Sequence, residues 1–204
     1  MELLIIKGSP HAQKKSNTDK IVKAFCQGFD GEDCTFTYYA LSDKSQWEAA
    51  RSAYAQSDNI LIATCMYVDC LPASLLEFLS SLPKKDGKAT LSFLIQCGFT
   101  EGKQLEVAIQ YAEQLPERLG CKSGGVLARG NSNSNLKAYT RMGRIFAKDG
   151  NFHNGKCRKF TGAYKLPWLV QRICAFIFKT SLKRQFENEA RKRGCKEPLD
   201  ARPY

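Results

Sequence analysis

The chain has 204 residues, 43% of them hydrophobic and 25% charged, a composition typical of a globular domain with one good-sized buried core. It contains no run near the ~20 apolar residues of a membrane-spanning helix, and the apolar run at residues 3–6 is too short for a secretion signal. The net charge of +11 is concentrated late: residues 1–136 carry 14 Lys and Arg against 15 Asp and Glu, whereas residues 137–204 carry 17 against 5. This asymmetry predicts an anionic partner for the last third, such as a phosphorylated cofactor, an acidic protein, a membrane surface or nucleic acid.

Strand and helix patterns alternate along the first part of the chain. Five apolar or β-rich runs are predicted to be strands, at residues 3–7, 35–39, 59–64, 89–96 and 121–128. Helical patterns follow them, at residues 17–29, 46–56, 71–82, 104–119 and 135–146. Because most of the strands are continuous apolar runs, we expect an α/β structure with a parallel sheet covered by helices on both faces. The order of the strands stays open.

The sequence changes character after residue 148, which predicts two parts, 1–148 and 149–204. Residues 149–161 are polar and contain glycines, so we expect a loop there. Residues 168–192 form one helical pattern that is apolar at first and basic later. The interpretation that we favour is a helix that packs on the body or across a dimer, with its charges in solvent. The alternative is a helix that binds nucleic acid or a membrane surface.

Nine cysteines are scattered through the sequence, and no two have Cys-x-x-Cys spacing. Zinc-site and thioredoxin-type motifs are therefore missing, and we predict no metal site. Several cysteines lie in apolar runs, where a free thiol acts as a small hydrophobic side chain. Because free thiols persist in reducing compartments, the sequence predicts a cytoplasmic protein.

The junction between the first strand and the first helix is rich in groups that bind phosphate. Hydroxyl and amide side chains collect close to the predicted start of the helix, at Ser9, Ser16, Asn17 and Thr18. A helix N-terminus adds free backbone N–H groups and the positive end of the helix dipole. The spacing matches neither the P-loop nor the Gly-x-Gly-x-x-Gly fingerprint. The alternative is an ordinary turn with a Ser or Asn N-cap.

Three loops are expected at one edge of the sheet, because the carboxyl ends of parallel strands lie together and ligands bind there. Tyr67 and Phe99 could flank a planar ring, and the backbone N–H of Gly98 could donate to its carbonyl oxygens. Each loop alone is more simply explained as a connection. Together with the phosphate-binding groups at the first strand–helix junction, the three loops favour a flat phosphorylated ligand. The loops are residues 8–16, 65–72 and 97–102.

Short motifs in these loops resemble those of the flavodoxin-like NAD(P)H-dependent FMN reductases and NAD(P)H:quinone oxidoreductases. Gly-Ser-Pro at residues 8–10, followed by Ser-Asn-Thr at residues 16–18, resembles the phosphate loop of that family. Residues 66–73 and 97–99 resemble its loops beside the flavin ring. The resemblance covers residues 1–148.

The sequence departs from the family pattern at three points. Met66 stands where proline is usual, which would leave the second loop less rigid. His11 and the pair Lys14 and Lys15 stand where an arginine and glycines are common. The cysteine cluster of related iron–sulfur flavoproteins is missing, so no iron–sulfur cluster is expected.

The resemblance implies a flavodoxin-like doubly wound five-stranded parallel sheet with helices on both faces, plus a C-terminal helical extension. It implies FMN bound non-covalently, NAD(P)H as co-substrate, and a small acceptor such as a quinone, flavin, nitro or azo compound. It also implies a homodimer. Since FMN would carry the chemistry, no side chain is nominated as catalytic. The residues implied at the phosphate are Ser9, His11, Ser16, Asn17 and Thr18. Those at the dimethylbenzene and N5 side are Met66, Tyr67, Val68 and Asp69, and those at the polar ring edge are Cys97, Gly98 and Phe99.

A flavodoxin-type electron carrier without a substrate of its own is the second hypothesis. Flavodoxins are typically strongly acidic, whereas residues 1–136 are close to neutral and the remainder is basic. The reductase is therefore preferred. No specific nucleic-acid partner is predicted, and the basic C-terminal helix would allow only a weak contact with an anionic surface.

Overall fold

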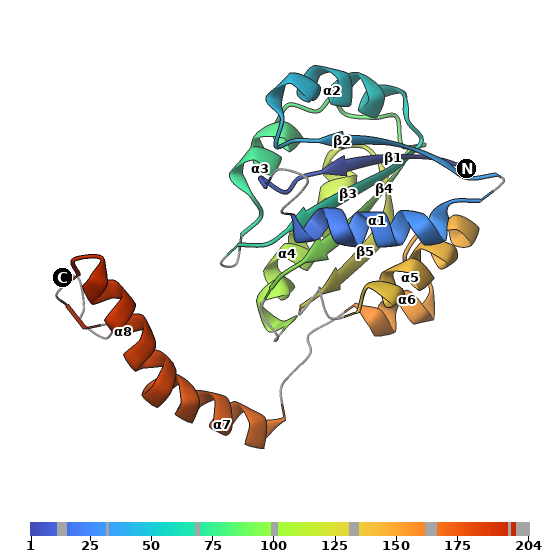
Figure 1. Ribbon diagram of the computed structural model, residues 1–204. Coiled ribbons are helices and arrows are strands. Elements are labelled where there is room, and N and C mark those ends of the chain that lie inside the picture. The colour runs from blue at the N-terminus through green and yellow to red at the C-terminus, as the bar shows by residue number, and fades with distance from the viewer. Residues whose placement is uncertain are drawn as a thin grey trace. The chain divides into compact units, whose positions relative to one another are not determined.

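The computed structural model describes residues 1–11, 16–31, 33–67, 70–98, 102–130, 135–161, 167–195 and 197–198. Contacts divide the chain into two compact units, Met1–Tyr164 and Lys165–Tyr204, and each is described by itself (Figure 1). The division predicted after residue 148 was based on composition and stays a prediction.

A five-stranded parallel sheet forms the centre of the first unit (Figure 1). The strand order is β2-β1-β3-β4-β5, and every neighbouring pair is parallel. The chain goes outward from β1 to β2 and then crosses back to β3, so the order reverses between β1 and β3. The prediction of five parallel strands is confirmed. The strands are β1 (Glu2–Lys7), β2 (Thr35–Ala40), β3 (Asn59–Cys65), β4 (Thr90–Gln96) and β5 (Lys122–Arg129).

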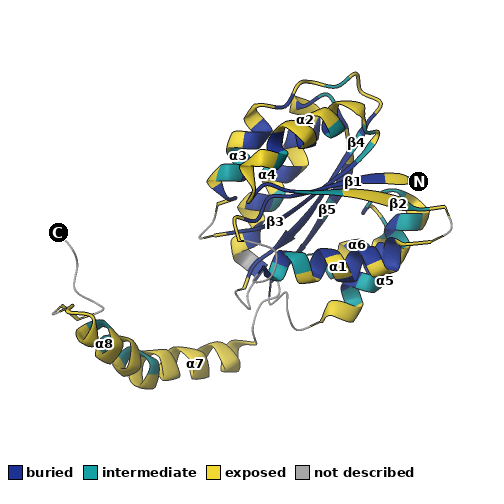
Figure 2. Cartoon of the chain, turned by 45° about the horizontal axis from the view of Figure 1, so that its top comes forward, coloured by how far each residue is buried: buried dark blue, intermediate teal, exposed yellow. Residues whose placement is uncertain are grey.

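Helices cover both faces of this sheet, as predicted (Figure 2). Successive side chains of β1 point to opposite faces, so Leu4 and Ile6 join one core cluster whereas Leu3 and Ile5 join the other. The first cluster packs under α2 (Trp47–Gln56), α3 (Ala73–Ser80) and α4 (Leu105–Arg118). The second packs under α1 (Asn17–Phe29), α5 (Leu136–Asp149) and α6 (Gly155–Phe160). Two 3-10 turns, η2 (Lys44–Gln46) and η3 (Gly102–Gln104), precede α2 and α4.

Two glycines allow α1 and α5 to pack very closely. A Cβ atom on Gly28 would lie 1.8 Å from the carbonyl oxygen of Thr140 in α5. A Cβ atom on Gly143 would lie 2.0 Å from the carbonyl oxygen of Phe25 in α1. Each glycine therefore faces the backbone of the other helix, and this packing fixes α1, whose N-terminus forms part of the site described below.

The helix α6 occupies part of the stretch that was predicted to be a loop, so that prediction was wrong for residues 155–160. Asn154 caps it by accepting a hydrogen bond from the backbone N–H of Lys156 at 2.9 Å. Cys157 anchors it in the second core cluster with a fully buried side chain. Six residues are too few to show a helical period in the sequence.

The second unit contains one continuous run of helix, which confirms the helical extension predicted over residues 168–192. It consists of α7 (Trp168–Ile177), the π-helical turn η5 (Phe178–Leu182) and α8 (Lys183–Lys192). None of the helices in the described part of the chain combines the length and the apolar character that crossing a bilayer requires.

Candidate functional site

The loops that leave β1, β3 and β4 begin in register at the carboxyl edge of the sheet. The N–H of Gly8 donates to the carbonyl oxygen of Ala63 at 2.8 Å, one residue beyond the end of β1. In the same way Met66 donates to Gln96 at 2.9 Å, and Cys97 donates to Arg129 at 3.2 Å. Each loop therefore starts from a position that the neighbouring strand fixes, and the three predicted loops leave one edge.

Two of the predicted phosphate ligands lie together at the start of α1. Ser16 is the N-cap of α1, and its Oγ accepts from the backbone N–H of Asp19 at 3.3 Å. The same hydroxyl donates to Oγ of Ser9 at 3.4 Å, and both side chains are buried. The N–H groups of the first turn of a helix have no intrahelical partners, so hydroxyls and backbone donors converge here.

Thr18 and Gln96 connect α1 to β4 below this point. The Thr18 side chain is fully buried, and its Oγ1 accepts from Nε2 of Gln96 at 3.1 Å. Asn17, the neighbouring predicted ligand, is half-buried. Thr18 thus serves the packing of the helix, and its role at the phosphate stays a prediction.

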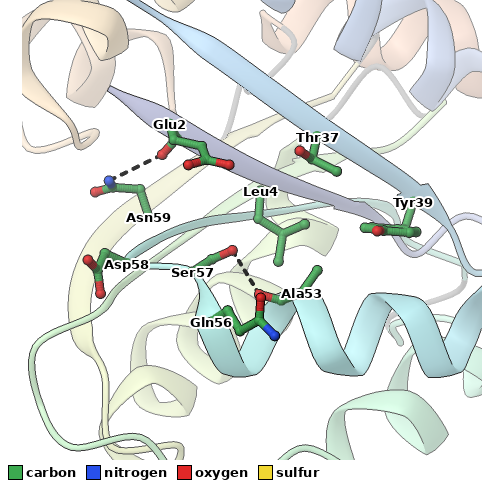
Figure 3. A pocket seen from close by; sticks show the side chains of 9 residues that line it. All are labelled: Glu2, Leu4, Thr37, Tyr39, Ala53, Gln56, Ser57, Asp58 and Asn59. Carbon is green, nitrogen blue, oxygen red and sulfur yellow. Dashed lines mark hydrogen bonds between the residues drawn. The ribbon is translucent and has the colours of Figure 1, made fainter.

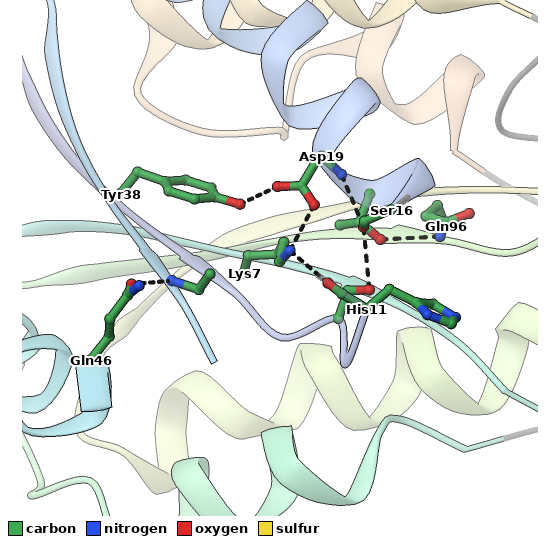
Figure 4. Close-up of polar contacts among 10 residues, drawn as sticks. Lys7, His11, Ser16, Asp19, Tyr38, Gln46 and Gln96 are labelled. Carbon is green, nitrogen blue, oxygen red and sulfur yellow. Dashed lines mark hydrogen bonds and ion pairs between the residues drawn. The ribbon is translucent and has the colours of Figure 1, made fainter. Parts of the chain in front are cut away.

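A buried charged cluster supports the first loop from beneath (Figure 4). Nζ of Lys7 donates to Oδ2 of Asp19 at 2.6 Å and to the carbonyl oxygen of His11 at 3.0 Å. The hydroxyl of Tyr38 donates to the other oxygen of Asp19. Burial first, and then the hydrogen bond to Asp19, raise the pKa of Tyr38. The cluster holds the backbone at His11 and the first turn of α1 in a fixed relation.

Sequence reasoning did not find this cluster. Its signal was a lysine, Lys7, in the last position of an otherwise apolar strand, together with Asp19 in the first turn of the next helix. A buried lysine needs acceptors, and the first acidic residue that follows it in the chain, Asp19, supplies one.

The second loop is closed by a small antiparallel bridge. The N–H of Tyr67 donates to the carbonyl oxygen of Cys70 at 2.9 Å, and the N–H of Cys70 donates back at 3.0 Å. The side chain of Met66 is buried, whereas Tyr67 is 44% exposed. Val68 and Asp69, the other predicted ligands of this loop, lie outside the described residues.

The rings of His11 and Tyr67 meet across the first two loops. Their centroids are 6.3 Å apart and their planes are inclined by 66°, an edge-to-face contact. Partial burial, followed by the charge and hydrogen bonding of Cys65, raises the pKa of Tyr67 to about 12. Tyr67 therefore stays neutral at physiological pH and presents an apolar ring with a hydroxyl donor.

The third loop begins with a buried thiol and an open backbone. The side chain of Cys97 is buried, and Gly98 is exposed; among the described residues other than its chain neighbours, no atom lies within 4 Å of the place where a Cβ would stand. A ligand could therefore approach the main chain at Gly98. Phe99, predicted beside it, lies outside the described residues.

A cavity of about 530 Å³ lies away from this edge, beside the amino ends of β1 and β3 (Figure 3). Two of its polar side chains are engaged with the protein backbone: Nδ2 of Asn59 donates to the carbonyl oxygen of Glu2 at 3.3 Å, and Oγ of Ser57 donates to Ala53 at 2.8 Å. The carboxylates of Glu2 and Asp58 make it unsuitable for a phosphate. Its lining is Glu2, Leu4, Thr37, Tyr39, Ala53, Gln56, Ser57, Asp58 and Asn59.

No family model and no curated protein matches this sequence. Solved structures do match the fold. The chain is similar to an FMN-dependent NADH-azoreductase from Bacillus anthracis in complex with FMN, at 10% identity and a TM-score of 0.58, over 72% of this chain and 98% of that chain. It is similar to an NAD(P)H:quinone oxidoreductase from Methanothermobacter marburgensis, at 16% identity and a TM-score of 0.53, over 76% and 98%. It is also similar to oxidised flavodoxin 1 from Bacillus cereus, at 14% identity and a TM-score of 0.56, over 73% and 99%.

The chain has a flavodoxin-like fold.

In a flavodoxin-like sheet the ligand crevice lies where the strand order reverses, outside the carboxyl ends of the strands. In this chain that point is between β1 and β3. The loop after β1 carries Ser9 and His11, and it ends at Ser16, the N-cap of α1. The loop after β3 carries Tyr67. The edge predicted from three separate loops is therefore the crevice edge of the flavodoxin-like fold. Within the described part of the chain, no group of three or more His, Cys, Asp or Glu side chains could hold a metal ion.

Proposed function

We propose that the chain binds FMN non-covalently at the β1–β3 edge and passes hydride from NAD(P)H through it to a small acceptor. The observation that carries this proposal is the meeting of the buried Ser9 and Ser16 hydroxyls at the N-terminus of α1, at the reversal of strand order. Hydroxyls, free helical N–H groups and a positive dipole end form a donor set that suits a phosphate dianion.

The remaining residues of the edge suit a flat ring with a polar rim. Tyr67 offers an exposed aromatic face, which His11 supports from the side. The open backbone at Gly98 can approach ring carbonyl oxygens. Val68, Asp69, Cys97 and Phe99 remain proposed contacts of the same ring. Bound FMN would supply hydride chemistry, and these residues would bind it, orient it and keep water from one of its faces.

The relatives in structure support a redox role and leave the acceptor open. One of them is named as an NADH-azoreductase with FMN and another as an NAD(P)H:quinone oxidoreductase. We propose a quinone, flavin, nitro or azo compound as the acceptor. We propose a homodimer on the resemblance to the reductase family, and a cytoplasmic location on the scattered free cysteines. Light scattering of the purified protein tests the dimer.

A flavodoxin-type electron carrier is the second candidate, because oxidised flavodoxin 1 shares the fold at a similar TM-score. The charge of the chain favours the reductase. Residues 1–136 are near neutral, which differs from the acidic surface expected of such a carrier.

Two measurements separate the candidates. Titration of the protein with FMN, followed by flavin fluorescence, is expected to saturate at one FMN per chain. Steady-state oxidation of NADH or NADPH with a quinone or azo acceptor is then expected to depend on the protein and on FMN. Saturable binding without turnover would favour the carrier, and failure to bind FMN would reject both.

A further inference from the structure

The helical run of the second unit exposes an unusual number of large apolar side chains. No residue of α7, η5 or α8 is buried (Figure 2). Trp168 is 67% exposed and Phe176 is 70% exposed. Scattered single apolar residues are normal on a protein surface, but contiguous ones mark a contact with a partner. The exposed set is Trp168, Leu169, Val170, Ile173, Phe176, Ile177, Phe178 and Phe186.

The apolar surface of α7 is too wide for a simple helix–helix seam. At about 100° per residue, the side chains from Phe176 round to Phe178 cover roughly 200° of the helix circumference. The remaining arc of roughly 160° holds Gln171 and Arg172, with Ala175 and Trp168 between them. A helix that packs on one protein face needs an apolar stripe of about 100°. The wider arc fits a medium that surrounds more than half of the helix.

The π-helical turn η5 carries the apolar face from α7 into α8. The ring centroids of Phe178 and Phe186 are 6.2 Å apart, although the two residues are eight positions apart in the chain. Oγ1 of Thr180 donates to the carbonyl oxygen of Phe176 at 2.8 Å and so satisfies a polar group inside this face. Phe186 therefore extends the apolar face along an otherwise polar helix.

Positive charge dominates the polar side of the same run. Between Trp168 and Lys192 the sequence has six Lys and Arg against two Glu. The two glutamates are already paired: Glu187 with Lys183 at 3.8 Å, and Glu189 with Lys192 at 3.7 Å. The cations that make no ion pair among the described residues of this run are Arg172, Lys179, Arg184 and Arg191. Such charge is complementary to an anionic surface.

These features favour a helix that lies on a bilayer. The ten residues of α7 are about 15 Å long, half of the ~30 Å of a hydrocarbon core. Amphipathic helices that lie in the interface have Trp, Phe and Leu on one face and Lys and Arg on the other. The guanidinium of Arg172 lies 5.5 Å from the Trp168 ring, which joins a cation and an interfacial aromatic at one end of the run.

We propose that the helix from Trp168 to Lys192 docks in the plane of an anionic lipid surface. The apolar face enters the boundary between headgroups and acyl chains, and the basic side chains contact the anionic headgroups. This inference does not depend on the proposed flavin chemistry.

The test uses the full chain and two vesicle compositions, phosphatidylcholine alone and phosphatidylcholine with added phosphatidylglycerol. Sedimentation with the vesicles measures binding. Trp47 is buried, and Trp168 is exposed but lies beside Arg172, outside the apolar arc. The variant Trp168→Phe, Phe176→Trp moves the exposed tryptophan into that arc, so a blue shift of its emission on binding reports the apolar face entering lipid. The expected result is binding to the anionic vesicles with a blue shift, weakened by salt, and much weaker binding to phosphatidylcholine alone.

Matched variants separate the two parts of the surface. The double variant Lys179→Glu, Arg184→Glu is expected to lower the partition coefficient at least tenfold, by a rough estimate from the effect of single basic residues. The same change of total charge in the first unit, Lys156→Glu with Lys159→Glu, is expected to leave binding unaltered. Phe176→Ser is expected to weaken binding, and Phe36→Ser, at an exposed phenylalanine of β2, is not. Circular dichroism confirms that the variants fold.

Several outcomes would overturn the proposal. One is no binding to anionic vesicles; another is equal binding to both vesicle types. A third is binding that the first-unit variants weaken as much as the helix variants. A dimer in solution that Phe176→Ser dissociates, with no vesicle binding, would assign the apolar face to a second copy of the chain. Tight DNA binding without vesicle binding would assign the charges to nucleic acid.

Discussion

The Nζ atom of Lys7 lies 2.6 Å from Oδ2 of Asp19, beneath the loop that begins the candidate site. Lys7 is the last residue of β1 and its side chain is fully buried, whereas that of Asp19 is 18% exposed. A buried cation is tolerated only when acceptors surround it, and here the carboxylate and the carbonyl oxygen of His11 do so. The pair therefore couples the sheet, the loop and the first turn of α1.

Removing one partner of this pair should destabilise the fold. Asp19→Asn is expected to lower the free energy of unfolding by about 3–5 kcal/mol, because it leaves the Lys7 charge buried without a counter-charge. The double variant Lys7→Met, Asp19→Asn should lose less than the sum of the single variants. Urea unfolding of the four proteins gives the coupling energy. Lys88→Met is the control, because its ion pair with Asp86 is exposed and should contribute under about 1 kcal/mol. If the loss of unfolding free energy in the double variant equals the sum of the losses in the single variants, Lys7 and Asp19 do not stabilise the fold as a pair.

Loss of the Ser9 hydroxyl should weaken FMN binding without unfolding the protein. Ser9→Ala removes one donor from the proposed phosphate seat and leaves the Ser16 N-cap in place. A hydrogen bond to a charged group contributes about 1.5–3 kcal/mol, so the Kd for FMN should rise by roughly 10-fold to 150-fold. Ser80→Ala, an exposed serine in α3, is the matched control. An unchanged Kd in Ser9→Ala would move the phosphate away from Ser9.

The close packing of α1 on α5 predicts a sharp contrast between glycines. Gly143→Ala should destabilise the fold by about 1–3 kcal/mol, because the added methyl would overlap the carbonyl group of Phe25 and force the helices apart. Gly155→Ala, in α6 with nothing within 4 Å, should be neutral or slightly stabilising. Thermal unfolding followed by circular dichroism measures both. Equal melting temperatures for the two variants would contradict the packing.

Two buried thiols predict how stability changes at high pH. Burial, with a smaller effect of the nearby Asp149 charge, raises the pKa of Cys157 from 9.0 to about 11. Burial and Asp30 raise the pKa of Cys26 from 9.0 to about 12. The unfolded chain therefore ionises first, so stability is full below pH 9 and falls as the pH rises toward these higher values.

The check is urea unfolding at a series of alkaline pH values. The free energy of unfolding should fall less steeply with pH in Cys157→Ala than in the unaltered protein. This holds even if the variant is already less stable at neutral pH. Cys174→Ala, at an exposed position of α7, should keep the original slope. A Cys157→Ala variant with the original slope would show that another group controls this range.

Local signals in the sequence were enough for most of the fold. Continuous apolar runs predicted β1, β3 and β4, and the helix cap at Ser16 predicted the start of α1. The strand order was not predictable, because it depends on which strands pair across long stretches of chain. The helix α6 was missed because one buried residue, Cys157, and a cap at Asn154 hold it in place, and neither leaves a periodic pattern.

Some features of the candidate site were likewise predictable from the sequence, and others were not. The closeness of the Ser9 and Ser16 hydroxyls was predictable, because the two residues flank one strand–helix junction. The support by Lys7, Asp19 and Tyr38 was not, since it joins three elements through side chains that are far apart in the sequence. The contact between His11 and Tyr67 also arises only when two loops leave the same edge. The role of every one of these residues toward FMN stays a prediction, and Val68, Asp69 and Phe99 lie outside the described residues.

The central claim is that FMN binds at the β1–β3 edge and exchanges electrons there with NAD(P)H. The most direct measurement is the visible absorption spectrum of the purified protein after incubation with FMN and removal of the excess, recorded without oxygen before and after NADH or NADPH is added. We expect retained flavin absorption that bleaches with one or both nucleotides and returns when a quinone is added. Absence of retained flavin, even after a large excess of FMN, would contradict it.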